Sequence, residues 1–218
     1  MRGQLAVLTL DHLTVIAPTL EEGVAHLDAC LGLKIPFGTR HAYMGTHNHG
    51  LRLGEGVYLE IIALDPDGLP PGRARWFGLD SEERVRSDWD NGRRLRGWVA
   101  ATGEIGAITA AHPAIFGDEV PLPPDAQDFA ISIPEDGSLP LDGAVPSLID
   151  HRGRPTDLTQ IPDLGARLSA LTLAHPDPGA IEAIYRDLEI DRPPTIVHGP
   201  ETRYRAMIGT PSGMKELT

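Results

Sequence analysis

The stretch that decides the fold lies between residues 5 and 32 and reads LAVLTLDHLTVIAPTLEEGVAHLDACLG. Its first part, residues 5–17, is apolar on both faces of an extended chain, which predicts a strand inside a sheet that is covered on each side. Thr19 and Glu22 then have the spacing of a helix-starting capping box. Leucine and valine recur at helical spacing up to Gly32, a residue suited to the end of a helix. A strand followed by a helix is therefore predicted.

The same kinds of element continue and then repeat along the chain. Two strands are expected at 41–53 and 56–64 and complete the first unit. A second unit follows, with a strand at 95–101, a helix at 104–111 and strands at 129–133 and 145–150. A third unit begins with a strand at residue 168. Between the first two units, residues 65–94 are rich in proline and charge, so we expect a linker and surface segment with a short helix near 81–86. Repeated units of this kind must pair to bury their sheet faces.

Composition and charge restrict the classes of function. The chain has 218 residues, 41% of them hydrophobic and 23% charged, which is enough apolar material for one domain or two small ones. A net charge of −12 disfavours nucleic acid as a partner. The single cysteine excludes a cysteine-rich zinc site, and no apolar run is long enough to predict a membrane span. The sequence has no phosphate-binding loop, dinucleotide fingerprint or nucleophile elbow. We expect a cytoplasmic protein.

Two ionisable residues interrupt apolar strands of the first unit. His12 lies among Leu, Val, Ile and Thr, and Glu60 lies within Val-Tyr-Leu-Glu-Ile-Ile. A buried carboxylate is costly unless it is paired or bound to a metal, and imidazole with carboxylate is a common divalent-metal pair. The alternatives are a hydrogen-bonded core histidine at His12 and an ion pair between Glu60 and Arg52. A hydrogen bond between His12 and Glu60 would also explain both residues.

A second polar cluster is Gly45-Thr-His-Asn-His-Gly50. In a strand, His47 and His49 point to one face of the sheet and Asn48 points to the other. Two histidines on one face can hold a metal, and they can equally form a polar rim. This spacing makes His47 a candidate for metal or substrate contact, together with His49.

The sequence resembles the glyoxalase-like domain of the vicinal oxygen chelate superfamily from residue 8 to about 178. The resemblance rests on four segments, Leu10-Asp-His-Leu-Thr-Val, Gly45-Thr-His-Asn, Tyr58-Leu-Glu-Ile-Ile and Pro146-Ser-Leu-Ile-Asp. It implies an α+β fold in which βαβββ modules pair into a curved, barrel-like sheet around a cavity, with helices outside. In the enzymes of this superfamily, the first strand of a module supplies a histidine and the last a glutamate, which correspond to His12 and Glu60. The divalent metal, here Zn, Fe, Mn, Ni or Co, then binds two neighbouring oxygens of the substrate as a Lewis acid.

The later units depart from this pattern. The last unit has Ala170 at the position of the histidine, and Glu216 matches the glutamate only after a gap. The middle unit offers Trp98 on its first strand and Asp150 or His151 at the end of its last. A complete set of four ligands is therefore not visible from spacing.

The predicted metal ligands are His12, Glu60 and His47. Glu60 is also the predicted catalytic residue. Further ligand or substrate contacts are expected among Asn48, His49, Trp98, Asp150 and Glu216. Residues 1–165 are expected to form the glyoxalase-like domain, with module 1 at about 5–65, a linker at 66–94 and module 2 at about 95–151. Residues 166–218 are expected to form a third, partial βαββ module on the same fold.

Two functions remain open at this point. One is a divalent-metal-dependent isomerase, lyase or dioxygenase that acts on a small oxygenated substrate. The other is a metal-free protein that binds or sequesters a small molecule in the same cavity. Three or four converging oxygen and nitrogen groups would favour the enzyme, and two would favour the binding protein. The sequence leaves open the substrate, the reaction and whether a homodimer completes the cavity.

Overall fold

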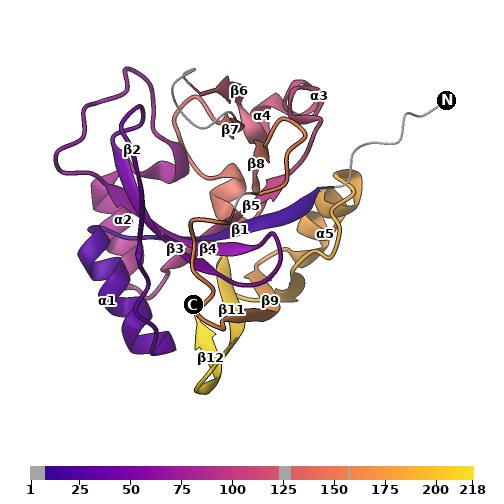
Figure 1. Cartoon of the computed structure of the whole chain (residues 1–218). Helices are drawn as coiled ribbons and strands as arrows, with labels where there is room; N and C mark the ends of the chain where they lie inside the picture. The colour runs from indigo at the N-terminus through magenta and orange to yellow at the C-terminus, as the bar shows by residue number, and fades with distance from the viewer. Residues whose placement is uncertain (1–7, 123–128, 157) are drawn as a thin grey trace.

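A computed structural model describes residues 8–122, 129–156 and 158–218 (Figure 1). The strands are β1 (Thr9–Ile16), β2 (Phe37–His41), β3 (Thr46–Arg52), β4 (Tyr58–Leu64), β5 (Leu95–Ala101), β6 (Asp118–Pro121), β7 (Ala130–Ile133), β8 (Ser147–Asp150), β9 (Arg167–His175), β10 (Thr195–His198), β11 (Arg203–Thr210) and β12 (Gly213–Leu217). The helices are α1 (Leu20–Leu31), α2 (Glu82–Asp90), α3 (Ile105–Ala111), α4 (Pro113–Phe116) and α5 (Pro178–Asp187), with 3-10 turns η1 (Trp76–Gly78) and η2 (Pro140–Gly143). No helix among these residues is long and apolar enough to cross a membrane.

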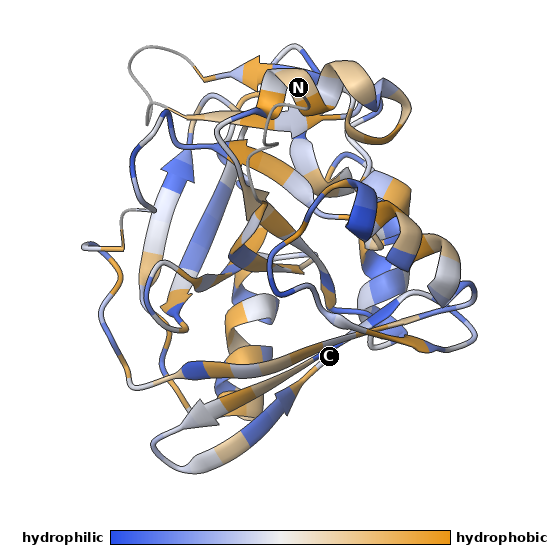
Figure 2. Ribbon diagram, turned by 90° about the vertical axis from the view of Figure 1, so that its right-hand side faces the viewer, coloured by the Kyte–Doolittle hydropathy of each residue, from blue (hydrophilic) through white to orange (hydrophobic). Residues whose placement is uncertain are grey.

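These strands form two sheets. The larger has eight strands in the order β2-β3-β4-β1-β5-β8-β7-β6 and curls into a half-barrel, and the smaller has four in the order β10-β9-β11-β12. Hydrophobic and hydrophilic residues alternate along many of the strands (Figure 2), as expected when a sheet buries one face more than the other. The predicted α+β class and curved, barrel-like sheet are confirmed.

Two βαβββ modules build the larger sheet. In the first, β1 pairs in parallel with β4, and β3 and β2 follow. In the second, β5 pairs in parallel with β8, and β7 and β6 follow in the same way. The modules join where β1 lies antiparallel to β5. The repeat seen in the sequence is thus a repeat of strand order.

The smaller sheet has a different strand order. Its first strand, β9, pairs in parallel with β10 and antiparallel with β11, whereas the first strand of each module pairs with the last. β12 packs against α1, and β11 packs against β5. The C-terminal residues therefore form a four-stranded sheet of their own beside the half-barrel, with one strand more than the expected βαββ unit.

The segment 66–94 contributes to the core as well as to the surface. Trp76, Phe77, Leu79 and Val85 are buried in one apolar cluster with Ile62 of β4. The short helix expected near 81–86 is longer and runs from Glu82 to Asp90. Proline and charge around these side chains hide their apolar character in the sequence, which is why a linker was expected.

Helix α1 begins and ends as the sequence predicts. The hydroxyl oxygen of Thr19 accepts a hydrogen bond from the backbone N–H of Glu22 at 3.2 Å, and Gly32 ends the helix with φ of 67°. The Thr19 hydroxyl also donates to the Glu22 carboxylate at 3.1 Å. Leu27 and Leu31 are fully buried in the cluster that lies between α1 and the larger sheet.

The approach of α1 to the larger sheet leaves no room for a side chain at Gly23. A Cβ there would collide with Ile61 and lie 2.9 Å from the Cβ of Ala17. Alanine favours helix by about 1 kcal/mol, but overpacking costs about 1–3 kcal/mol. We therefore expect Gly23→Ala to lower the free energy of unfolding measured in urea. Asp28→Ala, at an exposed position of α1, is the control and should not be destabilising; equal stability of the two variants would contradict the close packing.

Candidate functional site

His12 and Glu60 face the same side of the larger sheet. In the parallel register of β1 and β4, His12 lies opposite Tyr58 and Thr14 lies opposite Glu60. The alternate residue Leu13 belongs to the core beneath α1, so this set of side chains lies on the other face, which we call the inner face. His12 is 3% exposed and Glu60 5% exposed. The structure thus brings these two residues together on one face of the sheet.

Four side chains form a continuous polar row on this face. Nδ1 of His12 lies 2.6 Å from Oδ1 of Asp11, and Asn48 donates from Nδ2 to Oε1 of Glu60 at 2.7 Å. Nε2 of His12 lies 3.6 Å from Oε2 of Glu60, which is longer than a hydrogen bond. The two groups therefore face each other without a direct hydrogen bond. Among the described residues, Glu60 makes no ion pair with Arg52, the alternative partner.

Asp11 owes its position to a β-bulge. The pairing of β1 with β5 shifts by one residue between Leu10 and His12, which makes Asp11 the extra residue. Its carboxylate is also 2.8 Å from Nε2 of His151, and it accepts a hydrogen bond from the Thr156 hydroxyl at 2.5 Å. The sequence analysis missed Asp11 as a functional residue. The available signal was a second ionisable residue directly before His12 in an apolar strand.

The charges of this row depend on one another. Burial disfavours a charged ring at His12, but the hydrogen bond to Asp11 and the nearby Glu60 carboxylate outweigh it and raise the pKa of His12 to about 9. Burial likewise opposes charge on the carboxylates, yet His12 lowers the pKa of both Asp11 and Glu60, with help from His151 at Asp11. At neutral pH a buried imidazolium thus lies between two carboxylates.

Aromatic side chains form the rim of the site. The ring of Tyr58 stacks on that of His12 with 4.6 Å between centroids. Burial and the charge of Glu60 raise the pKa of both Tyr58 and Tyr43, so these hydroxyls remain protonated hydrogen-bond donors. Burial lowers the pKa of His41, whose Nδ1 lies 3.0 Å from the hydroxyl of Thr46. The rim is therefore neutral and rich in donors.

Two buried polar atoms near the row have no hydrogen-bond partner among the described residues. They are the hydroxyl oxygen of Thr14, which lies opposite Glu60 in the sheet, and the indole nitrogen of Trp76, whose ring contacts that of His41. An unsatisfied buried group costs about 1–3 kcal/mol, and native proteins normally satisfy such groups with water or a ligand. Each atom therefore leaves one hydrogen bond open to water or to a ligand.

The structure does not bring His47, the expected third ligand, to His12 and Glu60. In the register of β3 and β4, Asn48 lies opposite Ile62 on the inner face, while His47 and His49 lie opposite Ala63 and Ile61 on the face toward α1. Nδ1 of His49 lies 2.7 Å from the carbonyl oxygen of Ile35. Side chains alternate with a period of two, so Asn48 is the member of this cluster that joins the site.

The remaining expected contacts lie elsewhere. Trp98 faces the α1 side and donates from Nε1 to the hydroxyl of Tyr185 at 3.4 Å. Asp150 accepts a hydrogen bond from the backbone N–H of Arg152 at 2.7 Å, at the end of β8. Glu216 is in the smaller sheet, 3.5 Å from Nε of Arg205. None of these three side chains contacts the row of polar residues.

The donor set for a metal is incomplete in the described part of the chain. His12 and Glu60 supply two converging donors, and no group of three or more His, Cys, Asp or Glu side chains is arranged there to hold an ion. Catalytic divalent sites normally use three protein ligands. Among the described residues, His12 and Glu60 therefore supply fewer ligands than such a site uses.

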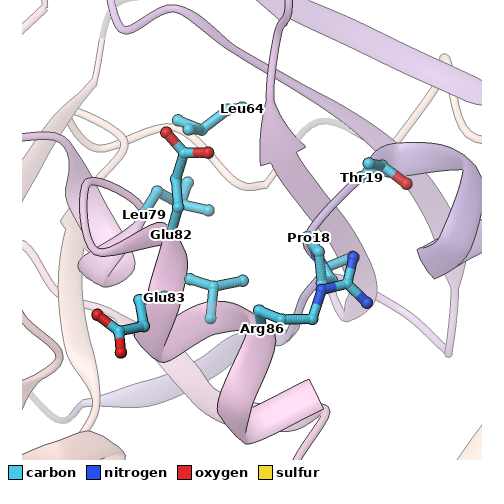
Figure 3. Close-up of a pocket in the computed structure, with 9 residues that line it drawn as sticks. Pro18, Thr19, Leu64, Leu79, Glu82, Glu83 and Arg86 are labelled. Atoms are coloured by element: carbon cyan, nitrogen blue, oxygen red, sulfur yellow. The ribbon is translucent and has the colours of Figure 1, made fainter. Parts of the chain in front are cut away.

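A cleft of about 400 Å³ lies between α2 and the segment that follows β1. In Figure 3, Glu82 points toward Leu64, and Arg86 points toward Pro18. The guanidinium of Arg86 is held by Glu22 at 2.7 Å. Neither His12 nor Glu60 lines this cleft, so it is separate from the polar row.

Comparisons with known proteins give one family and a set of distant structures. A family model described as a glyoxalase-like domain matches residues 10–189. A hypothetical protein from Staphylococcus aureus has a TM-score of 0.58 at 12% identity, with 90% of this chain and 88% of that chain covered. A methylmalonyl-CoA epimerase from Streptomyces coelicolor has a TM-score of 0.41 at 15% identity, with 69% of this chain and 99% of that chain covered. A methylmalonyl-CoA epimerase from Mycobacterium tuberculosis has a TM-score of 0.42 at 13% identity, with 69% of this chain and 92% of that chain covered. The staphylococcal structure is similar in fold alone. No curated protein matches the chain.

The raised pKa of His12 predicts a pH dependence of stability. The charged ring stabilises the folded state fully below the unfolded pKa of about 6.5, and this contribution is lost as the pH rises through about 9. We expect the free energy of unfolding, measured in urea, to fall over this range in the wild-type protein and to fall less in His12→Gln. His198→Gln, at an exposed position, is the control. The same pH slope in both variants would show that another group titrates.

Proposed function

Because the chain belongs to the glyoxalase-like domain family of the vicinal oxygen chelate superfamily, we propose that it binds a small oxygenated molecule against His12 and Glu60 on the inner face of the half-barrel. The observation that carries the proposal is the 3.6 Å separation between Nε2 of His12 and Oε2 of Glu60. Each atom can form a hydrogen bond to a ligand there, because neither bonds directly to the other.

The charges favour a ligand with two neighbouring oxygens. The His12 imidazolium donates to a carbonyl or carboxylate oxygen, while the Glu60 carboxylate accepts from a hydroxyl. The unpaired hydroxyl of Thr14 lies beside Glu60 and supplies a further hydrogen bond. A 2-hydroxy acid or a 1,2-diol would satisfy this arrangement, because each has a hydroxyl for Glu60 and a neighbouring oxygen for His12.

We assign proton transfer to Glu60. Asn48 holds Oε1 at 2.7 Å and so fixes the plane of the carboxylate, while Oε2 is turned toward His12. A positioned, ionised carboxylate can take a proton from a bound substrate and return it, which is the chemistry that isomerases and lyases need. His12 would stabilise the negative charge that develops on the substrate oxygen. Two converging ionisable groups, rather than three or four, favour binding of the molecule without a metal.

A divalent-metal-dependent enzyme is the second candidate. The observation that favours it is the Asp11 carboxylate on Nδ1 of His12, since metal-binding histidines commonly have such a partner on the other ring nitrogen. A metal at Nε2 would require His12 to lose its proton, so metal uptake would release a proton and rise with pH.

Binding should depend on both members of the pair. In titrations followed by NMR with a 2-hydroxy acid and with a 1,2-diol, we expect Glu60→Gln and His12→Ala to weaken binding by about tenfold or more, the loss of one hydrogen bond to a charged group. His49→Ala, on the opposite face, is the matched control and should bind like the wild type. Equal affinity in all three variants would contradict the proposed site.

Metal content separates the two candidates. The protein should be purified without an affinity tag and analysed for Mn, Fe, Co, Ni and Zn together. The first candidate predicts less than one metal per chain and no change in Glu60→Gln. One metal per chain that is lost in His12→Ala and Glu60→Gln, in folded protein, would establish the second candidate instead.

A further inference from the structure

A second cleft, of about 420 Å³, lies between the larger sheet and the C-terminal residues, away from the polar row. One wall is formed by Leu53, Val57 and Trp98 of the first two modules, and the other by Leu168 and Leu171 of β9. Trp98 faces this cleft from the opposite side of the sheet to His12. The cleft is therefore a separate feature from the His12–Glu60 site.

Backbone hydrogen bonds hold the walls of this cleft in place. The N–H of Leu168 donates to the carbonyl of Leu53 at 2.9 Å, and the N–H of Asp191 donates to the carbonyl of Leu8 at 2.8 Å. These hydrogen bonds fix the distance between the backbones of the two walls. A cleft of a few hundred Å³ whose lining is partly apolar and partly polar has the size and character of a small-molecule site.

The lining of the cleft carries one positive and one negative charge, on the neighbouring residues Arg192 and Asp191. Among the described residues that line it, Arg192 alone is cationic, and its side chain is 89% exposed. Its Nε donates to Asp191 at 3.1 Å, which leaves the two Nη groups directed to solvent. Arg192 has φ of 48°, an uncommon conformation for a residue with a side chain, and Pro193 and Pro194 follow it. The backbone that carries Arg192 at the cleft is therefore restricted in conformation.

We propose that this cleft binds a small amphipathic acid. Its aromatic or aliphatic body packs on Trp98, Val57 and the leucine side chains, where burial of apolar surface provides the main driving force. Its anionic head group lies at the mouth and pairs with the Nη groups of Arg192, whose two parallel N–H donors match the two oxygens of a carboxylate or sulfonate. The proposal does not depend on the function assigned to His12 and Glu60.

The test uses two probes that differ by a sulfonate group: anilinonaphthalene sulfonate and its uncharged analogue phenylnaphthylamine, which lacks that group, with binding followed by fluorescence. We expect the wild-type protein to bind both probes at one site. Arg192→Ala should weaken binding of the sulfonate by about tenfold, because one charged hydrogen-bonding partner is lost. The uncharged probe should bind to this variant as it does to the wild type. Arg73→Ala, which removes an exposed arginine outside the cleft, is the matched control. The same affinity for the sulfonate in Arg192→Ala and Arg73→Ala would overturn the proposal.

A second pair of variants tests the cleft itself. Val57→Trp places a large side chain in the apolar wall, and Ser169→Trp does so from an exposed position of β9 where folding is not at risk. We expect each variant that retains the wild-type circular dichroism spectrum to lose binding of both probes, and decanoate to displace both from the wild type. Undiminished binding in Ser169→Trp, or no binding to the wild type, would overturn the assignment.

Discussion

A carboxylate with three polar partners lies where the two modules of the larger sheet meet. Asp11 contacts His12 of its own strand and two residues that follow β8, His151 and Thr156. The bulge that turns Asp11 toward these partners also places its carboxylate on Nδ1 of the His12 ring. Asp11 and Glu60 together favour the cation at His12, and that cation in turn favours the ionised form of Glu60, whereas burial alone would favour neutral forms.

Much of this architecture could be predicted from the sequence because local rules and the global fold agree there. The hydroxyl of Thr19 and the left-handed Gly32 mark the ends of α1, and repeated strand and helix patterns predict paired modules. His12 and Glu60 could also be identified, because an ionisable residue in an otherwise apolar strand needs a partner. These predictions depend only on residues within the same segment.

Other features depend on information that periodicity does not contain. Residues 46–49 are polar on both faces of β3, so nothing in that strand indicates whether His47 or Asn48 faces inward; the pairing with β4 decides it. The bulge at Asp11 arises from the register with β5, a strand more than eighty residues away. Trp76 and Phe77 are buried by contacts with distant strands, although their own segment is rich in charge and proline.

The contact between Asp11 and the residues after β8 also bears on how this protein can be divided. A fragment that ended before β8 would keep β1, His12 and Glu60 in sequence, but the Asp11 carboxylate would lose both His151 and Thr156. His12 would then be oriented by a carboxylate that is itself free to turn toward solvent. The two modules, alike in strand order, are for this reason unequal in chemistry: one carries the ionisable pair, and the other supplies the donors that hold its supporting carboxylate in place.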